Sequence, residues 1–406
     1  MSSIKWPKKR LKRIVRCKYG DSLSKENREK GDVNVYGSNG VVGSHNKSIS
    51  FGKTIIIGRK GSSGSVHFSE NSCFPIDTTF FVDKTTTKAD IKYLFYLLGL
   101  LELDKMNSDS AVPGLNREHA YSKEVLSPSY TEQKIIAKYL DKTCASIDTI
   151  ISIKQKQLEL LEALKKSIIH KAVTQGLEDS VEMKDSGVEW LGKIPRHWKA
   201  VKLKRISKIQ SGLTLGKQYS GNLVKRSYLR VANVQDGYLD LQDVSTISLP
   251  KKTAAGLELK KGDVLMTEGG DLDKLGRGFL WEGQIEKCLH QNHIFAIRPI
   301  KSKLMAAFLT LITTSSYGRI YFEATGKKTT NLASTNASKI KAFPIPLPSK
   351  KEQGEIVDFL NKKTTQIEKL KKNIIKQIET LELYRKSIVH ECVTGKRRIT
   401  DNDLKE

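Results

Sequence analysis

Two long stretches of the chain carry apolar residues every three or four positions, which is the spacing of a coiled-coil seam. Residues 132–174 contain neither proline nor glycine, and residues 352–394 contain only Gly354, near their start. At a rise of about 1.5 Å per residue, each stretch would form a helix of about 60 Å. We therefore predict two long helices with one apolar seam each. The seam residues are Leu140, Ile147, Ile151, Leu158, Leu161 and Ile168 in the first helix and Leu360, Ile367, Ile374, Ile378, Leu381 and Ile388 in the second.

The two stretches are copies of one sequence. Aligned without a gap at an offset of 220 positions, residues 128–174 and 348–394 are identical at about 19 of 47 positions, which is far above chance. A looser match precedes each copy, at Trp6 and at Trp198, with an offset of 192 positions. The domain before the second copy is therefore longer than the first by 28 residues. The chain is a duplicated unit whose helices kept their length while its globular parts changed.

Each copy has helix start and stop signals. A serine followed three residues later by glutamate opens each one, at Ser129 and at Ser349, and this pattern is typical of a capping box. Gly176 and Gly395 stand just past the ends, where a left-handed residue terminates a helix at least cost.

The two seams are interrupted at different places. Ile151 occupies the position of Lys371, and Lys154 occupies the position of Ile374. Such complementary interruptions suit a pair of unlike helices better than a pair of identical ones. We predict that the helices pack against each other within the chain, antiparallel, as an intramolecular coiled coil. The alternative is that each helix packs on its own globular domain and the repetition reflects duplication alone.

The segments before the helices contain short β-type runs, glycine-rich loops and a late helix, an order that indicates α+β domains. In the first domain we predict strands near residues 52–58 and 77–82 and a helix at 92–103; in the second, strands at 228–232, 263–267 and 293–298 and a helix at 304–317. The predicted architecture is two mixed domains separated by two long antiparallel helices with a pseudo-two-fold axis. Its parts are a domain at 1–127, a helix at 128–176, a connector at 177–197, a domain at 198–347, a helix at 348–395 and a tail at 396–406.

The net charge of the chain indicates the kind of partner that it binds. The chain has 70 Lys and Arg against 44 Asp and Glu, a net charge of +26 spread over its length. The electrostatic field of so basic a chain attracts a polyanion. Nucleic acid is the first candidate and an acidic membrane surface is the second. No run of 18 apolar residues and no signal-like start is present, and five scattered cysteines indicate no disulfide framework. We predict a cytoplasmic protein.

Glycine-rich and polar loops that follow the predicted strands are the candidates for contact with DNA. Backbone amides and lysines suit phosphates, and the arginine fork also matches a guanine edge. The competing interpretation of any one loop is a tight turn with solvated charges. The candidates are Ser44, His45, Asn46, Lys47, Arg59, Lys60, Ser62 and Ser63 in the first domain and Lys217, Asn233, Gln235, Lys274, Arg277, Gln291, Asn292, Lys327 and Lys328 in the second.

Signals for catalysis and metal binding are weak. The chain has no nucleotide-binding glycine motif and no Pro-Pro-aromatic motif of amino methylation. Cys288, His290 and His293 could be three zinc ligands, but no fourth ligand stands at a usual spacing. We interpret them as part of a strand edge, and His170 and His390 as packing or capping residues. We predict no catalytic residue and no metal site in this chain.

Several motifs together resemble the specificity (S) subunit of type I restriction-modification systems, over nearly the whole chain. One departure is that the first domain ends in Leu126-Ser127-Pro128 where Pro346-Leu347-Pro348 closes the second. The motifs are YGSNGVVGSH at 36–45, IGRKG at 57–61, PIDTT at 75–79, MKDSGVEW at 183–190, IPRHW at 194–198, SGLTLG at 211–216, LRVANVQD at 229–236, PLPSKKEQ at 346–353 and KSIVH at 386–390.

The resemblance implies two target recognition domains that each read one half of a bipartite double-stranded DNA site, with the helices fixing the spacer. It implies two modification (methyltransferase) subunits that bring S-adenosylmethionine and two restriction (motor-nuclease) subunits that use ATP and Mg2+, with none of these cofactors bound by this chain. Two alternatives stay open: a self-sufficient methyltransferase or nuclease of a Type IIB-like system, and an architectural DNA-binding protein without a fixed site.

Overall fold

The computed structural model of the chain describes residues 6–105, 114–235, 237–270, 275–276, 278–328 and 333–404. The chain divides into two compact units, a first unit of residues 1–155 and 374–406 and a second unit of residues 156–373. Each unit contains one strand-rich domain and one half of each long helix. Among the described residues, no helix combines the length and the hydropathy that a membrane crossing requires.

Both long helices are present. Helix α3 (Tyr130–Gln175) has 46 residues and helix α8 (Lys350–Val393) has 44. At the start of α3 the backbone N–H of Ser129 donates to Glu132 Oε2 (2.8 Å), and the N–H of Glu132 donates to Ser129 Oγ (3.3 Å). This exchange is the predicted capping box. Gly176 and Gly395, with φ of +82° and +68°, follow the helix ends as the left-handed stop residues.

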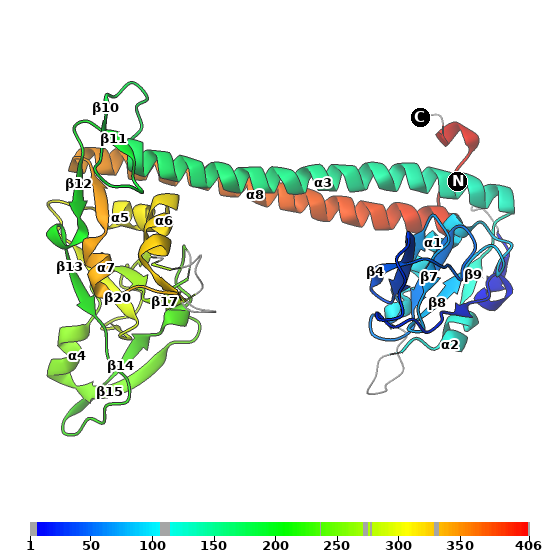
Figure 1. The fold of residues 1–406 in the computed structure, drawn as a ribbon, viewed down its shortest axis with the longest axis horizontal. Helices are drawn as coiled ribbons and strands as arrows, with labels where there is room; N and C mark the ends of the chain where they lie inside the picture. The colour runs from blue at the N-terminus through cyan, green and yellow to red at the C-terminus, as the bar shows by residue number, and fades with distance from the viewer. Residues whose placement is uncertain are drawn as a thin grey trace. The chain divides into compact units, whose positions relative to one another are not determined.

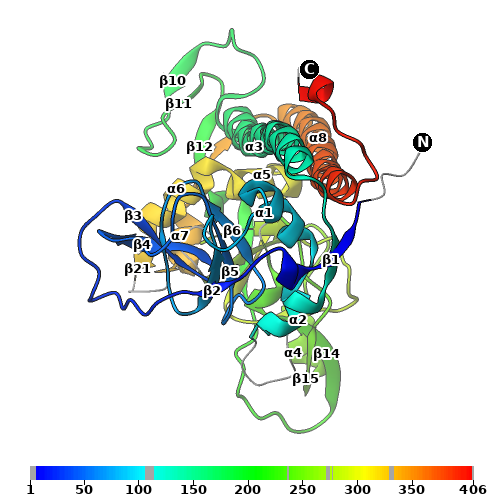
Figure 2. The same ribbon diagram turned by 90° about the vertical axis from the view of Figure 1, so that its right-hand side faces the viewer.

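The helices pair in the first unit through polar contacts that flank the seam. Arg385 Nε donates to Asp148 Oδ1 (2.9 Å), and Lys154 Nζ donates to Gln377 Oε1 (2.6 Å). A later residue of α3 therefore faces an earlier residue of α8, which makes the pair antiparallel. Figure 2 shows the two helices side by side.

The second unit contains the corresponding pairing. Lys165 Nζ bonds to Glu368 Oε1 and Lys371 Nζ to Glu162 Oε2, both at 2.7 Å. Lys165 and Glu368 occupy the same positions of the repeat as Arg385 and Asp148 of the first unit, so one ion pair is present twice. The predicted antiparallel, intramolecular pairing of the helices is confirmed within each unit, and the same contact of the repeat is present in both.

Burial along the seam is uneven. Leu140, Ile147, Leu360, Ile367 and Ile388 are at most 5% exposed. The other predicted seam residues are only half-buried, because a pair of helices has no third helix to close the seam: these are Ile151, Leu158, Leu161, Ile168, Ile374, Ile378 and Leu381.

The first unit's domain is built on two sheets. An antiparallel sheet has the strand order β2-β8-β5-β6, and a second sheet has the order β4-β3-β7 with β7 parallel to β3. Helix α1 packs on β5 and β6 (Figure 2), and β1 pairs with β9, which holds the start of the domain to its end. The elements are β1 (Lys8–Arg10), β2 (Lys18–Tyr19), β3 (Val33–Gly37), β4 (Gly40–His45), β5 (Thr54–Gly58), β6 (Val66–Ser69), β7 (Phe74–Pro75), β8 (Thr79–Val82), α1 (Ile91–Leu100), α2 (Arg117–Ser122) and β9 (Glu124–Leu126), with 3-10 turns η1 (Leu11–Arg13) and η2 (Leu103–Lys105).

The second unit's domain repeats this plan (Figure 1). Its antiparallel sheet has the order β13-β20-β16-β18, a second sheet has the order β15-β14-β19, and β12 pairs with β23 as β1 does with β9. The connector forms a β10-β11 hairpin. The elements are β10 (Met183–Asp185), β11 (Lys193–Pro195), β12 (Lys199–Lys202), η3 (Leu203–Arg205), β13 (Ser207–Ser211), β14 (Leu223–Leu229), η4 (Val231–Asn233), β15 (Ser245–Pro250), α4 (Lys251–Leu257), β16 (Val264–Thr267), β17 (Gly269–Gly270), β18 (Gly278–Leu280), β19 (Leu289–His290), β20 (Ile294–Pro299), α5 (Ala306–Thr314), α6 (Ser316–Thr325), β21 (Lys327–Lys328), β22 (Ala333–Ser334), α7 (Ala337–Ala342) and β23 (Pro344–Leu347); a last turn, η6 (Asp401–Leu404), belongs to the first unit.

Two sequence predictions need correction in this domain. The helix predicted at 304–317 is two helices, because Ser315 leaves the helical conformation and its Oγ accepts the N–H of Gly318 to start α6. The strand predicted at 228–232 is observed at Leu223–Leu229, and the turn η4 begins two residues later at Val231. The other predicted strands and the helix at 92–103 agree with the structure to within a few residues at their ends.

A buried ion pair ties β20 to the start of β16. Arg298 Nε and Nη2 donate to the two carboxylate oxygens of Asp263 at 2.7 and 2.6 Å, and Asp263 Oδ2 also accepts the N–H of Lys260. The Asp263 side chain is 1% exposed. An exposed pair of the same chemistry joins Arg230 to Asp243, whose side chain is 86% exposed.

These two pairs give a matched prediction. Asp263→Ala should reduce the free energy of local opening of β16 and β20 by about 2 kcal/mol, because it removes the buried carboxylate that accepts from the half-buried Arg298 and from the N–H of Lys260. Asp243→Ala should cost less than about 1 kcal/mol, because water already screens that pair. Native-state amide hydrogen exchange measures both, and equal protection in the two variants would contradict the assignment.

Candidate nucleic-acid interface

Basic and aromatic side chains gather at one edge of the first unit's domain. Arg59 follows β5 and lies beside Tyr19, with its guanidinium carbon 5.4 Å from the ring centroid. Arg117, at the start of α2, lies 5.2 Å from the same centroid. These residues and Lys60 line a cavity of about 330 Å3. Two cations on one aromatic ring, with a third cation beside them, form a surface complementary to nucleic acid.

The predicted candidates at 44–47 divide into exposed and buried residues. Ser44, Asn46 and Lys47 are exposed at the end of β4 and just beyond it. His45 is 6% exposed, its Nδ1 accepts the N–H of Glu29 (3.0 Å), and its ring packs edge-on against Phe74. Because its side chain is occupied by the fold, we keep only its exposed neighbours as candidates. In the next loop Ser62 is exposed and Ser63 is buried.

Candidates in the second unit divide in the same way. Asn233 is 3% exposed and organises its own loop, because its Oδ1 accepts the N–H of Arg230 (2.7 Å) and its Nδ2 donates to the carbonyls of Asp240 and Asp243. Gln235 donates to the carbonyl of Ala232 (2.6 Å). Of the remaining candidates, Lys217 and Lys327 are exposed and Gln291 and Asn292 are half-buried. Lys274, Arg277 and the side chain of Lys328 lie outside the described residues.

The structure adds two residues that the sequence did not indicate, Tyr19 and Arg117. Tyr19 pairs in register with Phe80, and Leu115 donates its N–H to the carbonyl of Arg59. These long-range backbone pairings bring residues of three separate segments together at one sheet edge. No local motif marks either residue, so only the topology could have identified them.

Each end of the helical pair is closed by the same clasp of tryptophan, glutamate and glycine. Trp6 Nε1 donates to Glu132 Oε1 (3.1 Å), and a Cβ placed on Gly395 would lie 3.1 Å from the Trp6 ring. In the second unit Trp198 Nε1 donates to Glu352 Oε1 (2.9 Å), with Gly176 against its ring. Each clasp joins the end of one long helix to the start of the other.

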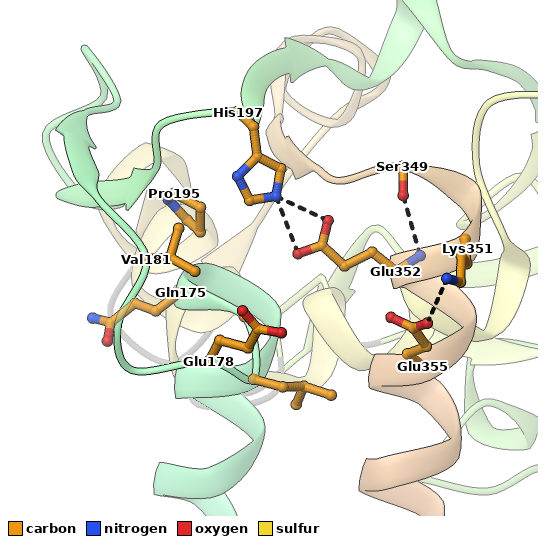
Figure 3. Close-up of a pocket in the computed structure, with 11 residues that line it drawn as sticks. Gln175, Glu178, Val181, Pro195, His197, Ser349, Lys351, Glu352 and Glu355 are labelled. Carbon is orange, nitrogen blue, oxygen red and sulfur yellow. Dashed lines mark hydrogen bonds and ion pairs between the residues drawn. The ribbon is translucent and has the colours of Figure 1, made fainter.

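The clasp of the second unit borders a cavity of about 380 Å3 (Figure 3). His197 and Glu352 point toward one another there, with Nε2 3.1 Å from Oε2, and Lys351 lies 3.7 Å from Glu355. The Glu352 carboxylate also accepts the Trp198 N–H. Its hydrogen bonds are therefore structural, and we assign this cavity no catalytic role.

The histidines considered as zinc ligands have other partners. His290 Nδ1 lies 2.8 Å from the carbonyl of Ile294, and His293 Nδ1 lies 2.5 Å from Glu268 Oε2. Burial raises the pKa of the Cys288 thiol to about 12, which disfavours the thiolate that zinc requires. No group of three or more His, Cys, Asp or Glu side chains suited to a metal occurs among the residues the structure describes.

Duplicated α+β domains, each joined to half of an antiparallel helical pair, define a pseudo-symmetric two-domain scaffold. The chain belongs to the family of type I restriction modification DNA specificity domains, which matches residues 3–162 and 195–380. The two matched regions correspond to the two halves of the duplication. The predicted family and α+β fold class are confirmed.

Two relatives of the chain are specificity subunits of type I restriction enzymes. The chain is 28% identical to the MjaX type I restriction enzyme specificity subunit of Methanocaldococcus jannaschii over 206 residues, 50% of this chain and 47% of that protein. It is 29% identical to the MjaVIII subunit of the same organism over 326 residues, 76% of this chain and 71% of that protein. The alignment thus spans about half of the MjaX subunit.

A solved structure from a study of complex assembly and conformational transition in the type I restriction-modification system shares the fold. Its TM-score is 0.70 at 16% identity, and the match covers 97% of this chain and 98% of that chain. At this identity the likeness concerns the fold alone.

Burial of His290 generates a prediction of pH dependence. Burial lowers the pKa of this histidine, while the neighbouring Asp263 and Arg298 act on it in opposite directions. The pKa of His290 in the folded protein is therefore below its ordinary value of about 6.5 in the unfolded chain. Above about pH 6.5 the ring is neutral in both states, and its contribution to stability is complete. Below that pH the unfolded chain binds a proton that the folded protein does not, so this contribution is lost. His290→Gln should flatten the decline of the second unit's melting temperature between about pH 6.5 and 5. Gln291→Ala, a neighbouring change without a titrating group, should keep the wild-type slope, and an unchanged slope in His290→Gln would contradict the assignment.

Proposed function

We propose that the chain is the DNA-recognition subunit of a type I restriction-modification complex and is itself non-catalytic. Each domain reads one half of a bipartite double-stranded site, and the helical pair sets the spacer between the halves. The observation that carries this proposal is the duplication of both domain and helix, because a pseudo-two-fold scaffold matches two half-sites read from opposite strands. The net charge of +26 supplies the attraction to DNA.

Two modification subunits and two restriction subunits complete the proposed complex and bring S-adenosylmethionine, ATP and Mg2+. Exposed apolar side chains on the long helices support a place for two equivalent partners. The first unit exposes Ile150 and Tyr384 (43% and 49%), and the second exposes Leu370 and Leu164 (52% and 48%). Ile150 and Leu370 are repeat equivalents, as are Leu164 and Tyr384. Each unit thus presents one copy of the same apolar pair, as docking of two like subunits requires.

A single substitution in one unit should remove one modification subunit. Tyr384→Glu places a charge in the proposed contact of the first unit and should convert a complex with two modification subunits into one with a single copy. Leu164→Glu should do the same in the second unit, and the double variant should bind neither. Native mass spectrometry of the co-expressed complex counts the copies. Exposed Lys156→Glu serves as the matched control, and two bound copies in the double variant would contradict this docking surface.

Methylome sequencing of cells with and without the chain tests the function itself. The expected result is adenine methylation of one bipartite motif that appears only with the chain and its partners. Methylation or cleavage by the purified chain alone, with S-adenosylmethionine and Mg2+, would instead support a self-sufficient Type IIB-like enzyme. Binding that falls steeply with salt and shows no sequence preference would support an architectural protein, because phosphate contacts are indifferent to sequence.

A paired deletion tests whether the helices set the spacer. Removing residues 153–159 of α3 together with 373–379 of α8 takes one heptad from equivalent places and keeps the three-and-four spacing of both seams. Seven residues correspond to about 10 Å of helix, or about three base pairs. The methylated motif should keep both half-sites while its spacer shortens by about three base pairs. Lys156→Ala with Lys376→Ala changes the same region without altering its length, and an unchanged spacer in the deletion would contradict the proposal.

A further inference from the structure

Tyr19 is the centre of a small cationic cluster in the first unit. Its side chain is 53% exposed, yet it is a large aromatic ring at the end of β2. The guanidinium carbons of Arg59 and Arg117 lie 5.4 and 5.2 Å from its centroid, and Phe80 packs on it edge-on at 4.9 Å. The ring thus fixes two cations that would otherwise repel each other.

Arg59 is held in one orientation. Its backbone N–H donates to the carbonyl of Thr78 (2.8 Å) and its Nε to the carbonyl of Asp77 (3.1 Å), while Tyr19 supports the guanidinium. No other hydrogen bond or ion pair of this guanidinium involves the described part of the chain. Its terminal nitrogens therefore remain available as a pair of parallel donors whose direction is set by the protein.

Arg117 lies against a second aromatic ring as well as Tyr19. Its Nη1 lies 3.5 Å from the carbonyl of Cys17, its Nε lies 3.6 Å from Glu118, and its guanidinium also lies 5.5 Å from the Tyr121 ring. Tyr121 is itself fixed, because its hydroxyl accepts the N–H of Cys17 (2.7 Å). Because the Arg117 guanidinium lies against two tyrosine rings and near the Cys17 carbonyl, we treat Arg117 as a support of Tyr19 and Arg59 as the residue that meets a ligand.

We propose that Arg59 reads one guanine in the half-site of the first unit, with Tyr19 and Arg117 as positioning residues. This inference rests on the proposed function. A guanidinium fork matches the O6 and N7 acceptors of guanine in the major groove, and a fork fixed at its Nε and on an aromatic face loses little entropy on binding. Exposed Lys60, the next residue, has the flexible point charge suited to a phosphate.

The experiment is selection from a randomised duplex DNA library with the assembled complex. Wild-type complex should enrich a bipartite motif with a fixed guanine in one half-site. Replacing that guanine by 7-deazaguanine, which lacks the N7 acceptor, should weaken wild-type binding by about five- to a hundredfold. Arg59→Lys, which keeps the charge and loses the fork, should remove this discrimination and leave the other half-site unchanged.

The positioning role of Tyr19 is tested by two substitutions. Tyr19→Phe should retain the guanine preference because it keeps the ring, whereas Tyr19→Leu should weaken it without changing any other position of the motif. Lys60→Gln is the phosphate control. It should lower affinity for every sequence alike and reduce the salt slope by about one.

The outcomes distinguish a failure of the guanine assignment from a failure of the proposed function. Enrichment of no motif by wild-type complex would overturn the proposed function. A wild-type motif that Arg59→Lys leaves intact, or an Arg59→Ala variant that weakens all sequences equally, would overturn the guanine assignment alone. Thermal unfolding of each variant distinguishes a local loss of recognition from a loss of fold.

Discussion

The antiparallel register of the two long helices is the constraint on which the rest of the structure depends. One ion pair, Asp148 with Arg385, is present again as Glu368 with Lys165. Because each member occupies the equivalent position in the other repeat, both pairs can form together in only one antiparallel register. These exposed pairs contribute little free energy. Their value is that a shift of either helix by one turn would break both.

The two clasps lie where the ends of the long helices meet the domains. Glu132 and Glu352 each accept an indole N–H from the tryptophan that opens a domain. Glu132 also caps the start of α3 with its side chain, and at the start of α8 the N–H of Glu352 donates to Ser349 Oγ. The tryptophan in turn lies against the glycine that ends the other helix. A side chain at Gly395 would meet the Trp6 ring and a strained left-handed backbone at once. The start of each domain is therefore linked to both helices by one hydrogen bond and one contact.

Sequence periodicity predicted the helices because the information is local: spacing, capping serine and terminal glycine all lie within the element itself. The different interruptions of the two seams, Ile151 opposite Lys371 in the alignment and Lys154 opposite Ile374, then predicted that the helices pair. The candidate interface was only partly predictable, since Tyr19, Arg59 and Arg117 come from three distant segments and meet through strand pairing. His45 and Asn233 show the opposite error. A polar residue at the end of a strand or in a turn looks the same in sequence whether its hydrogen bonds go to a ligand or, as here, to the protein's own backbone.

Burial shows how the helices and domains stabilise one another. The middle of the seam is half-buried and includes Lys154 and Lys371, so apolar burial there is modest. The seam ends are different, because Leu140 and Ile388 belong to the buried core of the first unit and Leu360 and Val173 belong to that of the second. Most of the hydrophobic stabilisation of the pair therefore comes from the domain cores. It follows that each domain holds its own half of the helical pair in register, and a domain can change its loops without altering the helices as long as this core face is kept.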